Sequence, residues 1–162
     1  MIGHFPFPVH PSYMSRVTYF TILRDPVERI ISLMNYHRWN VSAPNRKIVE
    51  DLEDRDALTA LLHPSLGHHN AITRFFGRPG DPFAAYQVAC MYFSHIGHVE
   101  EIDKTFEWLK CHGLSSGQPV EVNSSRDKSQ VEISYRDRAF IRAHLDDDLR
   151  LHDMLVNRPV GS

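Results

Sequence analysis

The chain has 162 residues, which is long enough for one domain with a buried core. Its formal net charge of −2 gives no overall reason to expect nucleic acid or an anionic membrane as a partner. Two cysteines make no disulfide framework, and no apolar run has the length that spans a membrane. We therefore expect one cytoplasmic domain that covers residues 1–162.

The first regular elements predicted are a strand and a helix that follow one another closely. Val17–Leu23 is a short apolar run rich in β-formers, as in a strand covered on both faces. Asp25 then suits a helix N-cap, and Pro26–Trp39 suits the helix itself. A strand that ends in Arg24 and leads into a helix N-terminus favours anion binding, because backbone N–H groups and the helix dipole point the same way.

The two faces of this helix differ in character. The apolar residues recur at the spacing i, i+3, i+4, i+7, which predicts a face that packs on the sheet: Val27, Ile30, Ile31 and Met34. Arg29, Ser32 and Tyr36 share the opposite face. That face is either part of a binding site or an ordinary wet surface, with Arg29 as a solvated charge.

The rest of the chain alternates a second short strand with several helices. The predicted elements are a helix over Lys47–His63 broken near Asp54–Asp56, helices Ala71–Phe76 and Phe83–Phe93, strand Ser94–Gly97, and helices capped by Asp103, Ser134 and Asp146–Asp148. We interpret Asp146–Asp148 as acids that complement a helix dipole. Few strands among many helices predict an α/β architecture.

Histidines are numerous, but their spacing does not indicate a metal site. The chain has eleven, including the neighbours His68 and His69, and the cysteines stand apart from them. No closed zinc motif is present, so we predict no metal. His95 and His98 flank the end of the second strand, and we expect them to point in different directions.

One motif resembles a known family. The pattern Arg-Asp-Pro-x-x-Arg-x-x-Ser-x-x-x-Tyr, from Arg24 to Tyr36, resembles the 3′-phosphate-binding segment of sulfotransferases that use 3′-phosphoadenosine 5′-phosphosulfate (PAPS). A weaker match is Gly3-His4, which resembles the Gly-His of the heparan-sulfate 2-O-sulfotransferase branch and its bacterial relatives. Asn70-Ala-Ile-Thr-Arg74, and Ile96-Gly97 followed by Glu100-Glu101, are similar to further elements of the family. The resemblance implies a helix-rich, three-layer fold like that of P-loop NTPases, with a short parallel sheet.

The resemblance also implies roles for individual residues. Arg24 and Ser32 would bind the 3′-phosphate, and Arg74 would reach it or support the site, the alternative being a surface arginine. His4 would be the general base that takes the proton of the acceptor hydroxyl, the alternative being an N-terminal residue without a role. PAPS would donate its sulfuryl group to a carbohydrate-type hydroxyl and leave as adenosine 3′,5′-bisphosphate, without a metal.

The second anchor of this family has no match in the sequence. That anchor is a glycine-rich loop with Lys and Ser/Thr, which cradles the 5′-phosphosulfate. We therefore expect either a fragment or a naturally truncated relative, lacking the N-terminal 5′-phosphosulfate loop and transferring little or no sulfate. The alternative function is a non-catalytic nucleotide-binding or interaction domain. We also expect a homodimer that covers an exposed sheet edge or apolar face.

Overall fold

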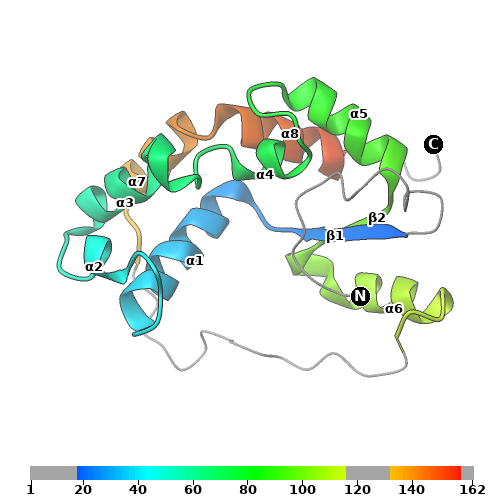
Figure 1. Ribbon diagram of the computed structural model, residues 1–162, viewed down its shortest axis with the longest axis horizontal. Helices are drawn as coiled ribbons and strands as arrows, with labels where there is room; N and C mark the ends of the chain where they lie inside the picture. The colour runs from blue at the N-terminus through cyan, green and yellow to red at the C-terminus, as the bar shows by residue number, and fades with distance from the viewer. Residues whose placement is uncertain (1–17, 116–131, 158–162) are drawn as a thin grey trace.

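The structure, a computed structural model, describes residues 18–115 and 132–157 as a short parallel sheet surrounded by helices (Figure 1). The elements are β1 Tyr19–Leu23, α1 Pro26–Trp39, α2 Arg46–Val49, α3 Asp54–Leu62, η2 Pro64–Leu66, α4 Ala71–Phe75, α5 Pro82–Tyr92, β2 Phe93–His98, η3 Val99–Glu101, α6 Ile102–Cys111, α7 Tyr135–Ala143 and α8 Asp146–Val156. The predicted helix-rich α/β architecture is confirmed. No helix within these two ranges combines the length and apolar character that a membrane crossing requires.

The sheet consists of β1 and β2, which pair in parallel with helices on both faces. The register runs from Tyr19 beside Phe93 to Leu23 beside His98, with one irregularity after Tyr19. On one face Phe20 contacts Trp108 of α6, with ring centroids 6.2 Å apart. On the other face the strands pack against α5 and the second half of α8. Because the strands are parallel, their carboxyl ends share one edge of the sheet.

The apolar face of α1 packs on other helices, so the prediction that it covers the sheet is wrong. Val27, Ile30 and Met34 are fully buried in a cluster to which α3 and α7 also contribute. Figure 1 shows the reason: α1 leads away from the sheet edge at which β1 ends, so its apolar face meets α3 and α7. The sheet has its own cluster with Leu23, α4, α5 and α8.

Helix α8 joins these two parts of the molecule. Leu149 packs against the cluster around α1, whereas Leu151 and Leu155 belong to the cluster beside the sheet. In Figure 1, α8 runs from α7 toward α5, above the sheet. Its position sets how the start of α1, α4 and the sheet edge lie relative to one another.

Most boundaries agree with the sequence prediction, and the exceptions are local. Helix α1 has the predicted ends, and Ser134 caps α7 by accepting a hydrogen bond from the Asp137 backbone N–H. The predicted break in the helix over residues 47–63 is present: α2 ends at Val49 and α3 begins at Asp54. Asp103 lies within the first turn of α6 and is not its cap, because the η3 turn already leads into that helix from Glu101.

Candidate functional site

The edge formed by the carboxyl ends of β1 and β2 carries the start of the predicted site. Arg24 follows β1 directly, and Asp25 caps α1 as predicted, since its Oδ1 accepts from the backbone N–H groups of Val27 at 2.9 Å and Glu28 at 3.0 Å. Glu28, in the first turn of α1, pairs with Arg138 of α7. Asp25 occupies these helix amides, so an anion at this edge depends on side chains.

Two of the predicted phosphate ligands are uncommitted. Arg24 and Ser32 are partly buried, and neither side chain makes a hydrogen bond or ion pair with another residue in ranges 18–115 and 132–157. Arg24 lies two residues before α1, and Ser32 lies within this helix. Side chains that have no partner in these ranges are available to bind an anion.

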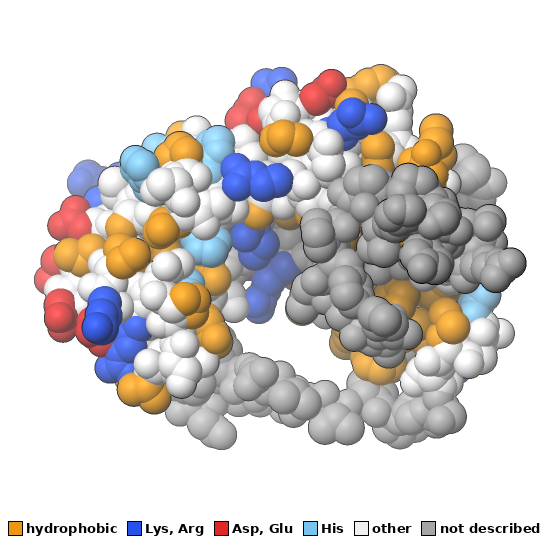
Figure 2. Space-filling view, in the orientation of Figure 1, with side chains coloured by type: hydrophobic (Ala, Val, Ile, Leu, Met, Phe, Trp, Pro, Cys, Tyr) orange, Lys and Arg blue, Asp and Glu red, His pale blue; other side chains and the backbone are white. Residues whose placement is uncertain are grey.

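Arg74 and His4 have different positions. Arg74 is exposed in the last turn of α4, and its Nη1 lies 3.1 Å from the point where a Cβ on Gly67 would stand. It therefore leans over the loop before α4, and within the described ranges no hydrogen bond joins it to Ser32. His4 lies outside the described residues. Figure 2 shows Lys and Arg side chains over α1 and α4 on this face.

Arg29, the second arginine of the motif, is held by the protein itself. Its Nη2 donates to the carbonyl oxygen of His68 at 2.7 Å and lies 3.8 Å from Oδ2 of Asp148. Burial lowers the pKa of Arg29, and the negative charge of Asp148 acts in the opposite direction. Arg29 therefore has a structural role and is not the solvated charge considered from the sequence.

Asp148 is fully buried, which corrects its interpretation as a residue that serves the dipole of its own helix. Its carboxylate accepts from the backbone N–H groups of Ile72 at 3.0 Å and Thr73 at 2.9 Å, and from Thr73 Oγ1 at 3.1 Å. It thus binds the first turn of α4. The sequence did indicate that Asp148 is buried. It lies three and seven residues before Leu151 and Leu155, so the three residues share one buried face of α8.

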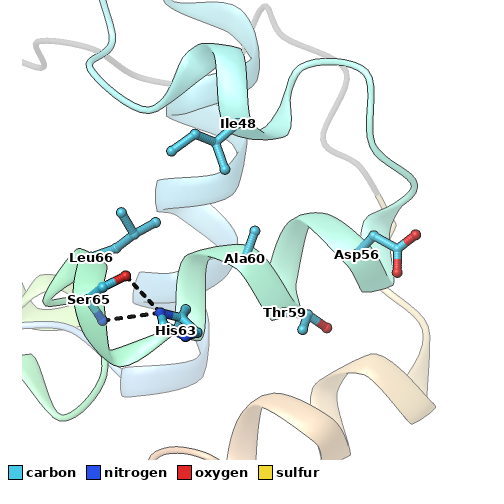
Figure 3. A pocket seen from close by; sticks show the side chains of 7 residues that line it. All are labelled: Ile48, Asp56, Thr59, Ala60, His63, Ser65 and Leu66. Atoms are coloured by element: carbon cyan, nitrogen blue, oxygen red, sulfur yellow. Dashed lines mark hydrogen bonds between the residues drawn. The ribbon is translucent and has the colours of Figure 1, made fainter.

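A groove elsewhere on the surface contains none of the predicted site residues (Figure 3). Its volume is about 410 Å³, and its lining comes from α2, α3 and η2: Ile48, Asp56, Thr59, Ala60, His63, Ser65 and Leu66. Nδ1 of His63 lies 2.7 Å from Oγ of Ser65 and also accepts from the Ser65 backbone N–H at 3.3 Å. These polar groups satisfy each other, and Asp56 lies toward the other end of α3, so the groove has no converging reactive groups.

The described residues include no group of three or more His, Cys, Asp or Glu side chains arranged to hold a metal ion. No family model, curated protein or solved structure matches the chain. What the protein binds must therefore be inferred from its side chains and from the resemblance of the segment Arg24–Tyr36.

Proposed function

We propose that this chain is a sulfotransferase-like protein whose sheet edge binds the adenosine 3′,5′-bisphosphate part of PAPS. Arg24 and Ser32 bind the 3′-phosphate, the first through charge-assisted hydrogen bonds and the second through its hydroxyl. One observation carries the proposal: of the two arginines of the motif, Arg29 is bound to other residues of the protein and Arg24 is not bound to any acidic residue that the structure describes. Arg29 is held by Asp148 and the His68 carbonyl.

The fold proposed with this function is the three-layer fold of sulfotransferases and P-loop NTPases. Two features support it: the parallel pairing of β1 with β2, and helices on both faces of the sheet. In open α/β sheets, ligands bind outside the carboxyl ends of the strands. Arg24 lies at that edge, so the binding site and the fold support the same proposal.

The reaction proposed is sulfuryl transfer to a carbohydrate-type hydroxyl, with little or no turnover by this chain alone because its sequence matches no 5′-phosphosulfate loop. The acceptor oxygen bonds to sulfur while the bond from sulfur to the 5′-phosphate oxygen breaks, and the nucleotide leaves with that electron pair. His4 takes the hydroxyl proton, and Arg74 supports the bound nucleotide. The protein contributes mainly position and positive charge, as in phosphoryl transfer.

Calorimetric titration tests the nucleotide site. We expect adenosine 3′,5′-bisphosphate to bind more tightly than 5′-AMP, because only the former presents a 3′-phosphate to Arg24. Arg24→Ala should remove this preference, whereas Arg142→Ala, at an exposed position on α7, should retain it. Equal affinity for the two nucleotides, or no binding of either, would contradict the proposal.

A transfer assay with PAPS and a hydroxyl-bearing saccharide separates the enzyme from its alternative. Turnover that disappears in His4→Ala would support the transferase. Nucleotide binding through Arg24 without turnover would support a non-catalytic nucleotide-binding domain.

A further inference from the structure

Two histidines meet at the sheet edge where Arg24 lies. His98 is the last residue of β2 and stands in register with Leu23, the residue before Arg24. His152 comes from α8, one turn after Asp148. Their ring centroids are 5.5 Å apart and the ring planes are perpendicular. His95 points the other way, onto Trp108 of α6, so the prediction that His95 and His98 diverge is confirmed.

The His98 and His152 rings contact each other but have no hydrogen-bond partner among the described residues. Nε2 of His152 is buried without a partner in these ranges. Helix α8 cannot easily shift to bring His152 to a hydrogen-bond partner, because Asp148, one turn earlier, is bound to α4 and lies beside Arg29. A buried nitrogen without a hydrogen bond is costly, and a ligand at this edge would relieve that cost.

The charges around the pair favour an anion as this ligand. Burial and the neighbouring His152 lower the pKa of His98, while Glu100 and Glu101 act in the opposite direction. Glu101 is occupied by Lys104, whose Nζ lies 2.5 Å away. On α8, Asp148 is bound to α4 and Asp146 to Arg150. Among the described residues Arg24 is a cation at this edge without an acidic partner, and in that part of the chain no third ligand joins the two imidazoles to complete a metal site.

We propose that His98 and His152 are a second anion-binding pair of the nucleotide site and take up a proton when an anionic group of the nucleotide binds. This inference rests on the proposed function, since Arg24 supplies the first anion contact. A phosphate or sulfuryl group at the edge favours the imidazolium form, which donates hydrogen bonds from both ring nitrogens. A nucleotide phosphate would thus add negative charge to that of Glu100 and Glu101, which already favours the protonated form of His98.

Titration calorimetry with adenosine 3′,5′-bisphosphate, in two buffers of different ionisation enthalpy at about pH 7, measures the protons taken up on binding. The wild-type protein should take up protons, and His98→Gln and His152→Gln should each reduce that uptake and weaken binding about tenfold. Because the phosphates also titrate near pH 6, each variant is compared with wild type under identical conditions. His63→Gln is the matched control, at an exposed position after α3.

The outcomes separate this inference from the proposed function. If wild type binds the nucleotide through Arg24 but both histidine variants take up as many protons as wild type, the histidine pair is excluded and the nucleotide site stands. If wild type does not bind, or Arg24→Ala binds as well as wild type, both proposals fail. NMR titration of the wild-type histidine rings covers the case in which a variant does not fold. The His98 pKa should rise when the nucleotide is added, and an unchanged value would overturn the inference.

Discussion

Oδ2 of Asp148 lies 3.8 Å from Nη2 of Arg29, and the same carboxylate binds the first turn of α4. One buried acid on α8 therefore connects three helices, two of which carry proposed ligands of the nucleotide: α1 with Ser32 and α4 with Arg74. Removing one partner of a buried ion pair is costly because the other charge stays buried without compensation. The geometry of the proposed site thus depends on a residue that need not touch the ligand.

The first prediction concerns Asp148. Asp148→Ala should lower the free energy of unfolding by about 3–5 kcal/mol, because Arg29 loses its ion-pair partner and the two backbone N–H groups of α4 lose their acceptor. Asp148→Asn should cost less, since the amide oxygen still accepts from α4. Urea denaturation followed by circular dichroism measures both. The matched control is Asp146→Asn, which removes an exposed ion pair with Arg150 and should cost within about 0.5 kcal/mol. Equal effects at the two positions would show that Asp148 has no special role.

The second prediction concerns the contact between β2 and α6. A Cβ on Gly97 would stand 1.9 Å from Oγ1 of Thr105 and 3.1 Å from Nε2 of His95. Gly97→Ala should therefore destabilise the fold by about 1–3 kcal/mol or more, because strand and helix must separate. The cost should be smaller in a Thr105→Ala background, which removes the closest atom. Thermal unfolding of the two single variants and the double variant measures this coupling, and a purely additive result would contradict the packing described.

The third prediction concerns the cap of α1. Asp25→Ala should cost about 1 kcal/mol of unfolding free energy, because the N–H groups of Val27 and Glu28 lose their acceptor. Asp25→Ser should recover most of this stability, since serine also caps helices. Chemical denaturation of the three proteins provides the measurement. A serine variant as unstable as the alanine variant would assign the effect to the charge of Asp25 instead of its hydrogen bonds.

Local signals explain why the sequence predicted α1 so closely. Asp25 and Pro26 determine where α1 begins through hydrogen bonds and backbone geometry within a few residues. Which element the apolar face of α1 packs against depends on the direction in which the chain leaves β1. A short-range sequence pattern does not predict that direction. For the same reason the role of Arg29 was open in the sequence, because its partners His68 and Asp148 lie on distant segments. The predicted ligands Arg24 and Ser32 came from a motif, and the structure adds that both are uncommitted within the described ranges.

The last prediction concerns His37 and acid pH. His37 is only 2% exposed, and neither ring nitrogen has a hydrogen-bond partner among the described residues. Burial lowers its pKa, and the pKa of the neighbouring His68 is lowered by burial, by Arg29 and by His37. The ring centroids of the two histidines are 6.0 Å apart, so protonation of one disfavours protonation of the other.

A lowered pKa in the folded state means that the unfolded chain binds more protons, so stability should fall as the pH drops below about 6.5 toward the folded-state pKa. His37→Leu should flatten this dependence, because it removes one titrating ring and one charge that opposes protonation of His68. Urea midpoints at about pH 7.5, 6.5 and 5.5 measure the slope. His63→Leu is the control and removes an exposed ring. If His37→Leu retains the full wild-type slope while His63→Leu reduces it, the acid sensitivity comes from the surface and not from the buried histidines.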